Sequence, residues 1–140
     1  MADLTQTASS VAPGTPAFKL TGIVNAAVVA GQPCYQGNDG YWYPAVNDSA
    51  LHAGSNRLAI ALDSAPGAGQ PVTLLTSGQM NLGATLTVGE TYVVSKNTGK
   101  IAPISDLIAG NFVSILGVAI STTILETPPS GPFASGVTHA

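Results

Sequence analysis

The sequence predicts an all-β domain, folded as a single β-sandwich or a jelly-roll-like barrel. Sixteen glycines and ten prolines interrupt the chain so often that a helix of ordinary length has almost no room. Between them lie short runs of apolar and β-branched residues, which are typical of a sandwich or barrel. A third observation is an approximate internal repeat at an offset of 58 positions, which places Gly31 on Gly89 and Asp48 on Asp106.

The most regular strand pattern runs from Met80 to Val88, where every second residue is apolar. Asn38-Asp39-Gly40 and Asn97-Thr98-Gly99 have the residue types of tight hairpin turns. A short helical turn is the most that residues 46–53 and 105–109 can hold. Nine further segments are predicted strands: 18–25, 33–36, 41–45, 58–62, 72–76, 91–96, 100–103, 112–116 and 118–125.

The offset of 58 positions also places residues 58–62 on residues 116–120, and both are apolar runs. In each repeat unit a glycine-led strand is followed by a hairpin, a proline, an Asp-containing loop and this apolar strand. We therefore predict an internal duplication, over about 30–65 and 88–123, whose two halves share one core. The alternative is coincidence, because glycine and alanine are common here and match easily.

Charged residues are unusually rare, at 8% of the chain, against about 25% in an average soluble protein. Lys and Arg together number four, Asp and Glu seven, and the net charge is −3. A surface of uncharged polar side chains is easily covered by a partner, because burying a hydroxyl costs less than burying an unpaired charge. The composition favours assembly, with an uncharged polar monomer as the alternative. So few cations argue against direct binding of nucleic acid.

Residues that carry enzyme chemistry are few and scattered, so no catalytic site is predicted. Asp48, Ser49 and His52 include the residue types of a hydrolase triad, but a capped loop explains this spacing better. The single Cys34 has no Cys or His neighbour at metal-ligand spacing and is expected to be a buried apolar side chain. We predict no cofactor and no metal ion. No apolar run is long enough to suggest a membrane span.

The two ends of the chain differ in composition from the predicted β domain, which spans residues 18–126. Residues 1–17 and 127–140 are rich in proline and small polar residues, with little to bury. They are predicted to be extended arms held by a neighbouring subunit. The apolar residues in these arms are candidate contacts: Leu4, Val11 and Phe133.

Three consecutive aromatic residues, Tyr41, Trp42 and Tyr43, lie on one predicted strand. Successive side chains of a strand point to opposite faces, so at least one of the three leaves the face of the others. An outward ring is a candidate anchor for a protein interface or a stacking platform for a sugar. Alternatively, Trp42 belongs to the core and the two tyrosines cover the end of the barrel.

Several strand and turn motifs together resemble the capsid cement, or head decoration, proteins of tailed bacteriophages. The resemblance spans about residues 18–126. The motifs are Gly31-Gln32-Pro33, Leu58-Ala59-Ile60-Ala61-Leu62, Gly69-Gln70-Pro71-Val72, Val88-Gly89-Glu90-Thr91-Tyr92-Val93-Val94, Gly99-Lys100-Ile101-Ala102-Pro103 and Leu116-Gly117-Val118-Ala119.

This resemblance implies a β-barrel or jelly-roll-like protein that binds the outside of a mature phage shell as a dimer or trimer. Its implied partners are the major capsid protein, whose neighbouring copies it bridges, and itself. It implies a location in the host cytoplasm before assembly and on the virion surface afterwards. The family has no invariant functional residue to transfer, and long polar arms are a departure from its simplest form. A carbohydrate-binding or tail-associated β module that uses Tyr41–Tyr43 is the alternative function.

Overall fold

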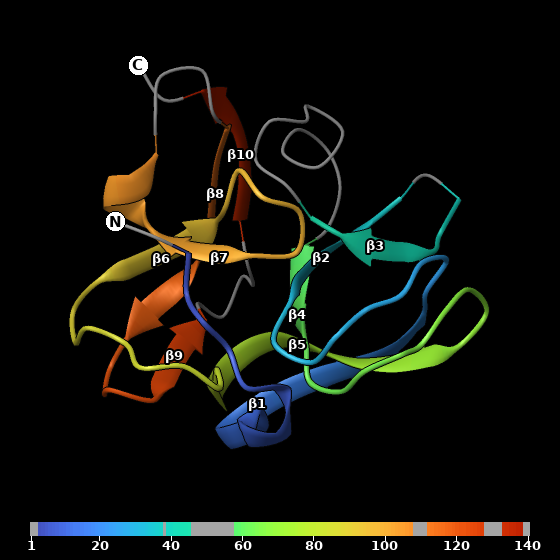
Figure 1. The fold of residues 1–140 in the computed structure, drawn as a ribbon, viewed down its shortest axis with the longest axis horizontal. Coiled ribbons are helices and arrows are strands. Elements are labelled where there is room, and N and C mark those ends of the chain that lie inside the picture. The colour runs from blue at the N-terminus through green and yellow to red at the C-terminus, as the bar shows by residue number, and fades with distance from the viewer. Residues whose placement is uncertain (1–2, 38, 46–57, 108–111, 128–132, 139–140) are drawn as a thin grey trace.

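The computed structural model describes residues 3–37, 39–45, 58–107, 112–127 and 133–138. Ten strands form one curled antiparallel sheet in the order β3-β2-β4-β5-β9-β8-β6-β7, with β1 paired to β5 and β10 paired to β8 (Figure 1). The described residues outside strands form turns, loops and two short 3-10 turns. The predicted all-β fold class is confirmed.

The strands and 3-10 turns have the following bounds: η1 (Ala8–Ser10), β1 (Ala12–Ile23), β2 (Pro33–Gln36), β3 (Trp42–Pro44), β4 (Leu58–Ala61), β5 (Pro71–Asn81), β6 (Thr91–Val94), β7 (Ile101–Pro103), η2 (Ile104–Asp106), β8 (Phe112–Ala119), β9 (Ile124–Thr127) and β10 (Phe133–Thr138). The helical turn expected within 105–109 begins one residue early, as η2. The one expected within 46–53 lies outside the described residues.

The strand pairing repeats at the offset of 58 positions seen in the sequence. The Gly31 N–H donates to the Ala61 carbonyl oxygen, and the Gly89 N–H donates in the same way to Ala119, both at 2.8 Å. The two glycines have φ values of 92° and 86°, a region that favours glycine. β2 pairs with β4 as β6 pairs with β8. Pro33 lies opposite Ile60 in the first pair of strands, and Thr91, 58 positions later, lies opposite Val118 in the second. The duplication is therefore visible in the backbone.

The offset also relates β1, of 12 residues, to β5, of 11 residues. The chain thus contains two four-strand modules, the first made of β1–β4 (residues 12–61) and the second of β5–β8 (residues 71–119). β1 and β5 pair antiparallel along their whole length, from Ala12 opposite Asn81 to Ile23 opposite Pro71, with two irregularities in register. This ladder of backbone hydrogen bonds joins the two modules.

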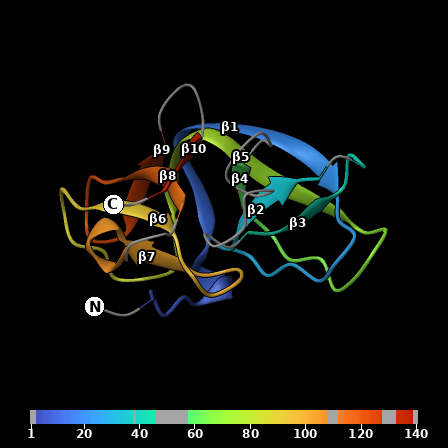
Figure 2. The ribbon, with the colours of Figure 1, turned by 90° about the horizontal axis from the view of Figure 1, so that it is seen from above.

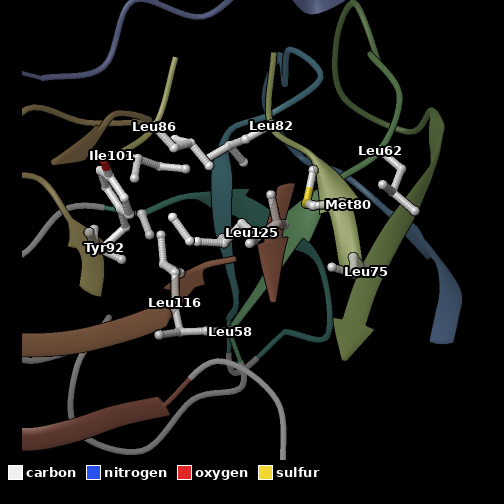
Figure 3. Close-up of a cluster of buried hydrophobic side chains, with 14 of the residues drawn as sticks. Leu58, Leu62, Leu75, Met80, Leu82, Leu86, Tyr92, Ile101, Leu116 and Leu125 are labelled. Atoms are coloured by element: carbon white, nitrogen blue, oxygen red, sulfur yellow. The ribbon is translucent and has the colours of Figure 1, made fainter. Parts of the chain in front are cut away.

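Two clusters of buried side chains form the core. The larger cluster takes residues from both modules, and Figure 3 shows Leu58 beside Leu116, with Leu125 near the centre of the cluster. The smaller cluster, around Trp42, takes most of its residues from the first module together with Val72 and Leu74 of β5. Each face of the first module's sheet is therefore packed against apolar side chains.

The most regular strand prediction, Met80–Val88, is wrong beyond the end of β5 at Asn81. Gly83 follows with a φ of 74°, and its N–H donates to the side-chain oxygen of Asn81 at 2.9 Å, so the chain turns there. Leu82 and Leu86 are nevertheless buried in the larger cluster. The alternation thus marks two buried side chains of a loop, whose N–H groups donate to the Thr123 and Thr122 carbonyl oxygens without continuing the strand.

The N-terminal residues, expected to form an extended arm held by a neighbouring subunit, contact their own chain. Residues 12–17 belong to β1, and the segment before them runs along the second module (Figure 2). The Leu4 N–H donates to the Ile101 carbonyl oxygen at 2.8 Å, and the Thr7 N–H to that of Gly83 at 2.6 Å. Within the predicted C-terminal arm, β10 pairs with β8. Both ends therefore add to the sheet of their own chain, because their backbone groups find partners there.

Candidate interaction surfaces

Trp42 is buried, with 2% of its surface exposed, at the centre of the smaller core cluster. Its indole lies over Gly22 of β1, where a Cβ atom would approach the ring to 2.5 Å. The small Ala59 and Ala61 belong to the same cluster. The structure thus places Trp42 in the core, where its ring is covered and is not presented to a protein or a sugar.

The two flanking tyrosines have different environments. Tyr41 is 42% exposed, and its N–H donates to Asp39 Oδ1 at 3.0 Å. The Tyr43 hydroxyl donates to Asp39 Oδ2 at 2.5 Å and accepts from Asn25 Nδ2 at 3.1 Å. Its ring stacks on that of Tyr35, with centroids 5.4 Å apart. Tyr43 therefore holds the β2–β3 hairpin in place, and Tyr41 alone of the three aromatic residues is exposed.

The hydrogen bond between Asp39 and Tyr43 shifts both of their pKa values. It lowers the pKa of the Asp39 carboxyl, and the hydrogen bond from the Tyr41 N–H lowers this pKa further, because both donors favour the carboxylate. It raises the pKa of the Tyr43 phenol, because the proton is shared with a negative acceptor. Burial is the main reason that the pKa of Tyr35 is also raised.

Replacing Asp39 by asparagine is expected to lower the pKa of Tyr43 toward its ordinary value, because the hydrogen bond from the phenol to a carboxylate is lost, and with it the charge that opposes the phenolate. Nuclear magnetic resonance of the assigned Tyr43 ring across a pH titration measures this. Asp63→Asn is the matched control, since Asp63 accepts instead from the Thr73 N–H. An unchanged Tyr43 pKa in the Asp39 variant would contradict the contact.

The three apolar residues predicted in the arms do not gather with the aromatic hairpin. Leu4 and Val11 are half-buried and pack against the larger core cluster. Phe133 begins β10, opposite Ile115 of β8, and its side chain lies outside the described residues. The structure therefore assigns Leu4 and Val11 a packing role within the chain.

Eight large apolar side chains are exposed in the described part of the chain, and only Tyr41 was among the predicted contacts. They are Phe18, Ile23, Val29, Tyr41, Val88, Ile104, Val118 and Ile120. Val118 and Ile120 lie two positions apart at the end of β8, and the Gly89–Ala119 hydrogen bond brings Val88 beside them. We name Val88, Val118 and Ile120 the β8 patch. Both Val118 and Ile120 lie in the apolar run 116–120.

A shallow polar hollow lies between the N-terminal segment and the loop that follows β5. Its lining consists of hydroxyl, amide and small side chains: Thr5, Thr7, Ser10, Asn81, Gly83, Ala84, Thr85 and Thr123. Sugar sites commonly combine such groups with an aromatic ring. Because this lining has no aromatic residue, the hollow lacks the stacking surface that the carbohydrate alternative requires.

Among residues 3–37, 39–45, 58–107 and 112–127, no group of three or more His, Cys, Asp or Glu side chains is placed to hold a metal ion. Cys34 is buried, and burial raises the pKa of its thiol to about 12. Asp48, Ser49 and His52 lie outside the described residues. No helix within the described ranges is long and apolar enough to cross a membrane.

No protein-family model matches the chain, and no curated protein is significantly similar to it in sequence. Any functional assignment therefore depends on the surface of the fold. That surface combines exposed apolar side chains, uncharged polar side chains and very few charges.

Proposed function

We propose that this protein is a structural capsid cement protein, which binds the outer surface of a phage head and bridges copies of the major capsid protein. The observation that carries the proposal is the set of exposed large apolar side chains on a chain with only 8% charged residues. Neighbouring exposed apolar side chains, such as Val88, Val118 and Ile120, favour a surface that another protein covers, and the centres of protein interfaces are depleted in charge. The motifs that resemble cement proteins favour a phage shell as that partner.

The all-β fold agrees with this proposal, because a rigid sheet keeps its contact residues in fixed positions on a lattice. The N-terminal segment and β10 are held by their own chain, so the proposed contacts are on the folded body. The proposal places the protein on the outer surface of the virion, with no direct contact to nucleic acid.

Heads purified from the phage that encodes this chain are expected to contain it in amounts comparable to the major capsid protein, as measured by quantitative mass spectrometry. Heads that lack it should release their DNA at a lower temperature, because the shell loses the contacts that join its subunits. Adding back the purified protein should restore the release temperature. Its absence from intact heads, or identical heat release with and without it, would exclude the proposal.

Tyr41 keeps the carbohydrate-binding alternative testable, because it is the exposed ring of the aromatic hairpin. Under that alternative, a glycan array should show binding that Tyr41→Ala abolishes. Val29→Ala changes a side chain of similar exposure on the same module and is the matched control. Glycan binding that depends on Tyr41 would favour this alternative over the cement function.

A further inference from the structure

Two rings of paired strands share β5. The first ring runs β3-β2-β4-β5-β1 and closes where the chain leaving β1 meets β3. There Val24 forms a parallel bridge with Trp42, and the Asn25 N–H donates to the Trp42 carbonyl oxygen at 3.2 Å. Val24 and Trp42 both belong to the smaller core cluster. The first ring is therefore closed by its own strands.

The second ring runs β5-β9-β8-β6-β7 and closes differently. β7 is the counterpart of β3, so that Ile101 begins β7 as Trp42 begins β3, and Gly83 is the counterpart of Asn25 at the offset of 58 positions. The Gly83 N–H, however, donates to a side chain of its own loop. The Ile101 carbonyl oxygen accepts instead from the Leu4 N–H at 2.8 Å. A segment from the N-terminus therefore occupies the closing position.

We name residues 3–11, which precede β1, the strap. Beyond its contact with β7, the strap reaches the chain that leaves β5 (Figure 1). The Thr7 N–H donates to the Gly83 carbonyl oxygen at 2.6 Å, and the side-chain amide of Gln6 donates to that of Leu82 at 3.0 Å. The strap thus supplies donors to carbonyl groups on both sides of the gap. It completes the second ring, which the strands of that ring leave open.

The strap is held mainly by hydrogen bonds near the surface. None of its residues is buried, and Leu4 and Val11, which pack against the larger core cluster, are half-buried. The polar hollow lies between the strap and the loop after β5, with Thr5, Thr7 and Ser10 on the strap side, so that water reaches this seam. Segments with little buried apolar surface open locally at a lower free energy than the whole fold.

We propose that the strap is a gate, which opens and closes as one unit while the strands of both rings stay paired. Opening gives access to the end of the larger core cluster that Leu4 and Val11 cover. It also frees the backbone carbonyl groups of Ile101 and Gly83. The first ring stays closed, because its closing residues continue directly from β1. The gate belongs to a single chain and needs no shell, so it goes beyond the proposed function and is tested separately.

Hydrogen exchange of the full chain, resolved by residue with nuclear magnetic resonance at several urea concentrations, tests the gate. The Leu4 and Thr7 N–H groups are expected to be at least about a hundredfold less protected than those of Ala61 and Ala119, which donate within the first and the second ring. Exchange at Leu4 and Thr7 should also depend less on urea, because opening the strap exposes less surface than global unfolding.

Gln6→Ala should speed exchange at Leu4 and Thr7 alike, by roughly tenfold, because the strap loses hydrogen bonds that only its closed state forms. Gln36→Ala is the matched control, since the amide of Gln36 donates to a carbonyl of its own hairpin. It should leave exchange in the strap unchanged. If the strap opened only with the whole fold, both variants would speed its exchange.

Asp3→Ala distinguishes a single unit from a fraying end. The Asp3 carboxylate accepts from the Ser95 hydroxyl and from Asn97 Nδ2 at the start of the strap. Losing these contacts should speed exchange at Thr7 as much as at Leu4. Faster exchange at Leu4 alone would overturn the proposal, as would protection and urea dependence at both residues equal to those of the rings. Either result would leave the proposed cement function standing, because binding to phage heads tests that function.

Discussion

Replacing Trp42 by alanine is expected to lower the free energy of unfolding by about 3–5 kcal/mol, the usual cost of deleting a large aromatic side chain from a core. The indole is 2% exposed and lies over Gly22 in the smaller core cluster. Its neighbours Ala59 and Ala61 are too small to fill the space that it would leave. Urea unfolding followed by circular dichroism measures the loss.

Tyr41→Ala is the matched control, because Tyr41 is the preceding residue and is 42% exposed. Its cost is expected to stay below about 1 kcal/mol, as for most surface substitutions. Equal losses in the two variants would contradict the burial of Trp42. The comparison also affects binding assays, because a Trp42 variant can lose a partner simply by unfolding, whereas a folded Tyr41 variant reports on the surface.

The fold class and the duplication could be predicted because both depend on local chemistry. Glycine and proline limit the length of every element, whatever the tertiary structure. Gly31 and Gly89 have positive φ at matching places in the two modules, so a backbone requirement kept the same residue in both. The prediction therefore depended on residue types that are tied to backbone geometry. Gly40 and Gly99, with φ values of 85° and 74°, predicted the two hairpins in the same way.

The candidate site could be predicted only in part, because burial depends on which strands become neighbours. The apolar run 116–120 predicts a buried strand, but the register of β8 shifts opposite Tyr92 and Val93, and beyond this shift Ala119 is buried while Val118 and Ile120 are exposed. Alternation correctly placed successive aromatic residues on different faces, but it could not tell which face of the strand packs against the core.

The ends of the chain were predicted from their lack of apolar residues, which gives no information on backbone pairing. Leu4 and Thr7 are held through their N–H groups, and every residue except proline has such a donor. The Asp3 carboxylate adds contacts of 2.5 Å to the Ser95 hydroxyl and 2.7 Å to Asn97 Nδ2. Polar sequences can therefore be fixed by hydrogen bonds that no hydropathy pattern reveals.

Gly78→Ala is expected to lower the free energy of unfolding by about 2–5 kcal/mol, the sum of two separate costs. The first is conformational, because Gly78 has a φ of 98° that a side chain strains. The second is steric, because the added Cβ would lie 2.5 Å from the Pro16 carbonyl oxygen and 3.0 Å from the Ala17 Cα. Both obstacles are backbone atoms of β1, so relief requires moving the strand.

Gly89→Ala separates these two costs. Gly89 has a similar φ of 86°, but nothing lies within 4 Å of the position of its Cβ. Only the conformational cost of about 1–2 kcal/mol is expected there. Urea unfolding of both variants measures the difference, which is the energy of the close approach between β1 and β5. Equal losses would mean that β1 can move away from Gly78 freely, and the β1–β5 ladder would then not be the rigid joint between the modules.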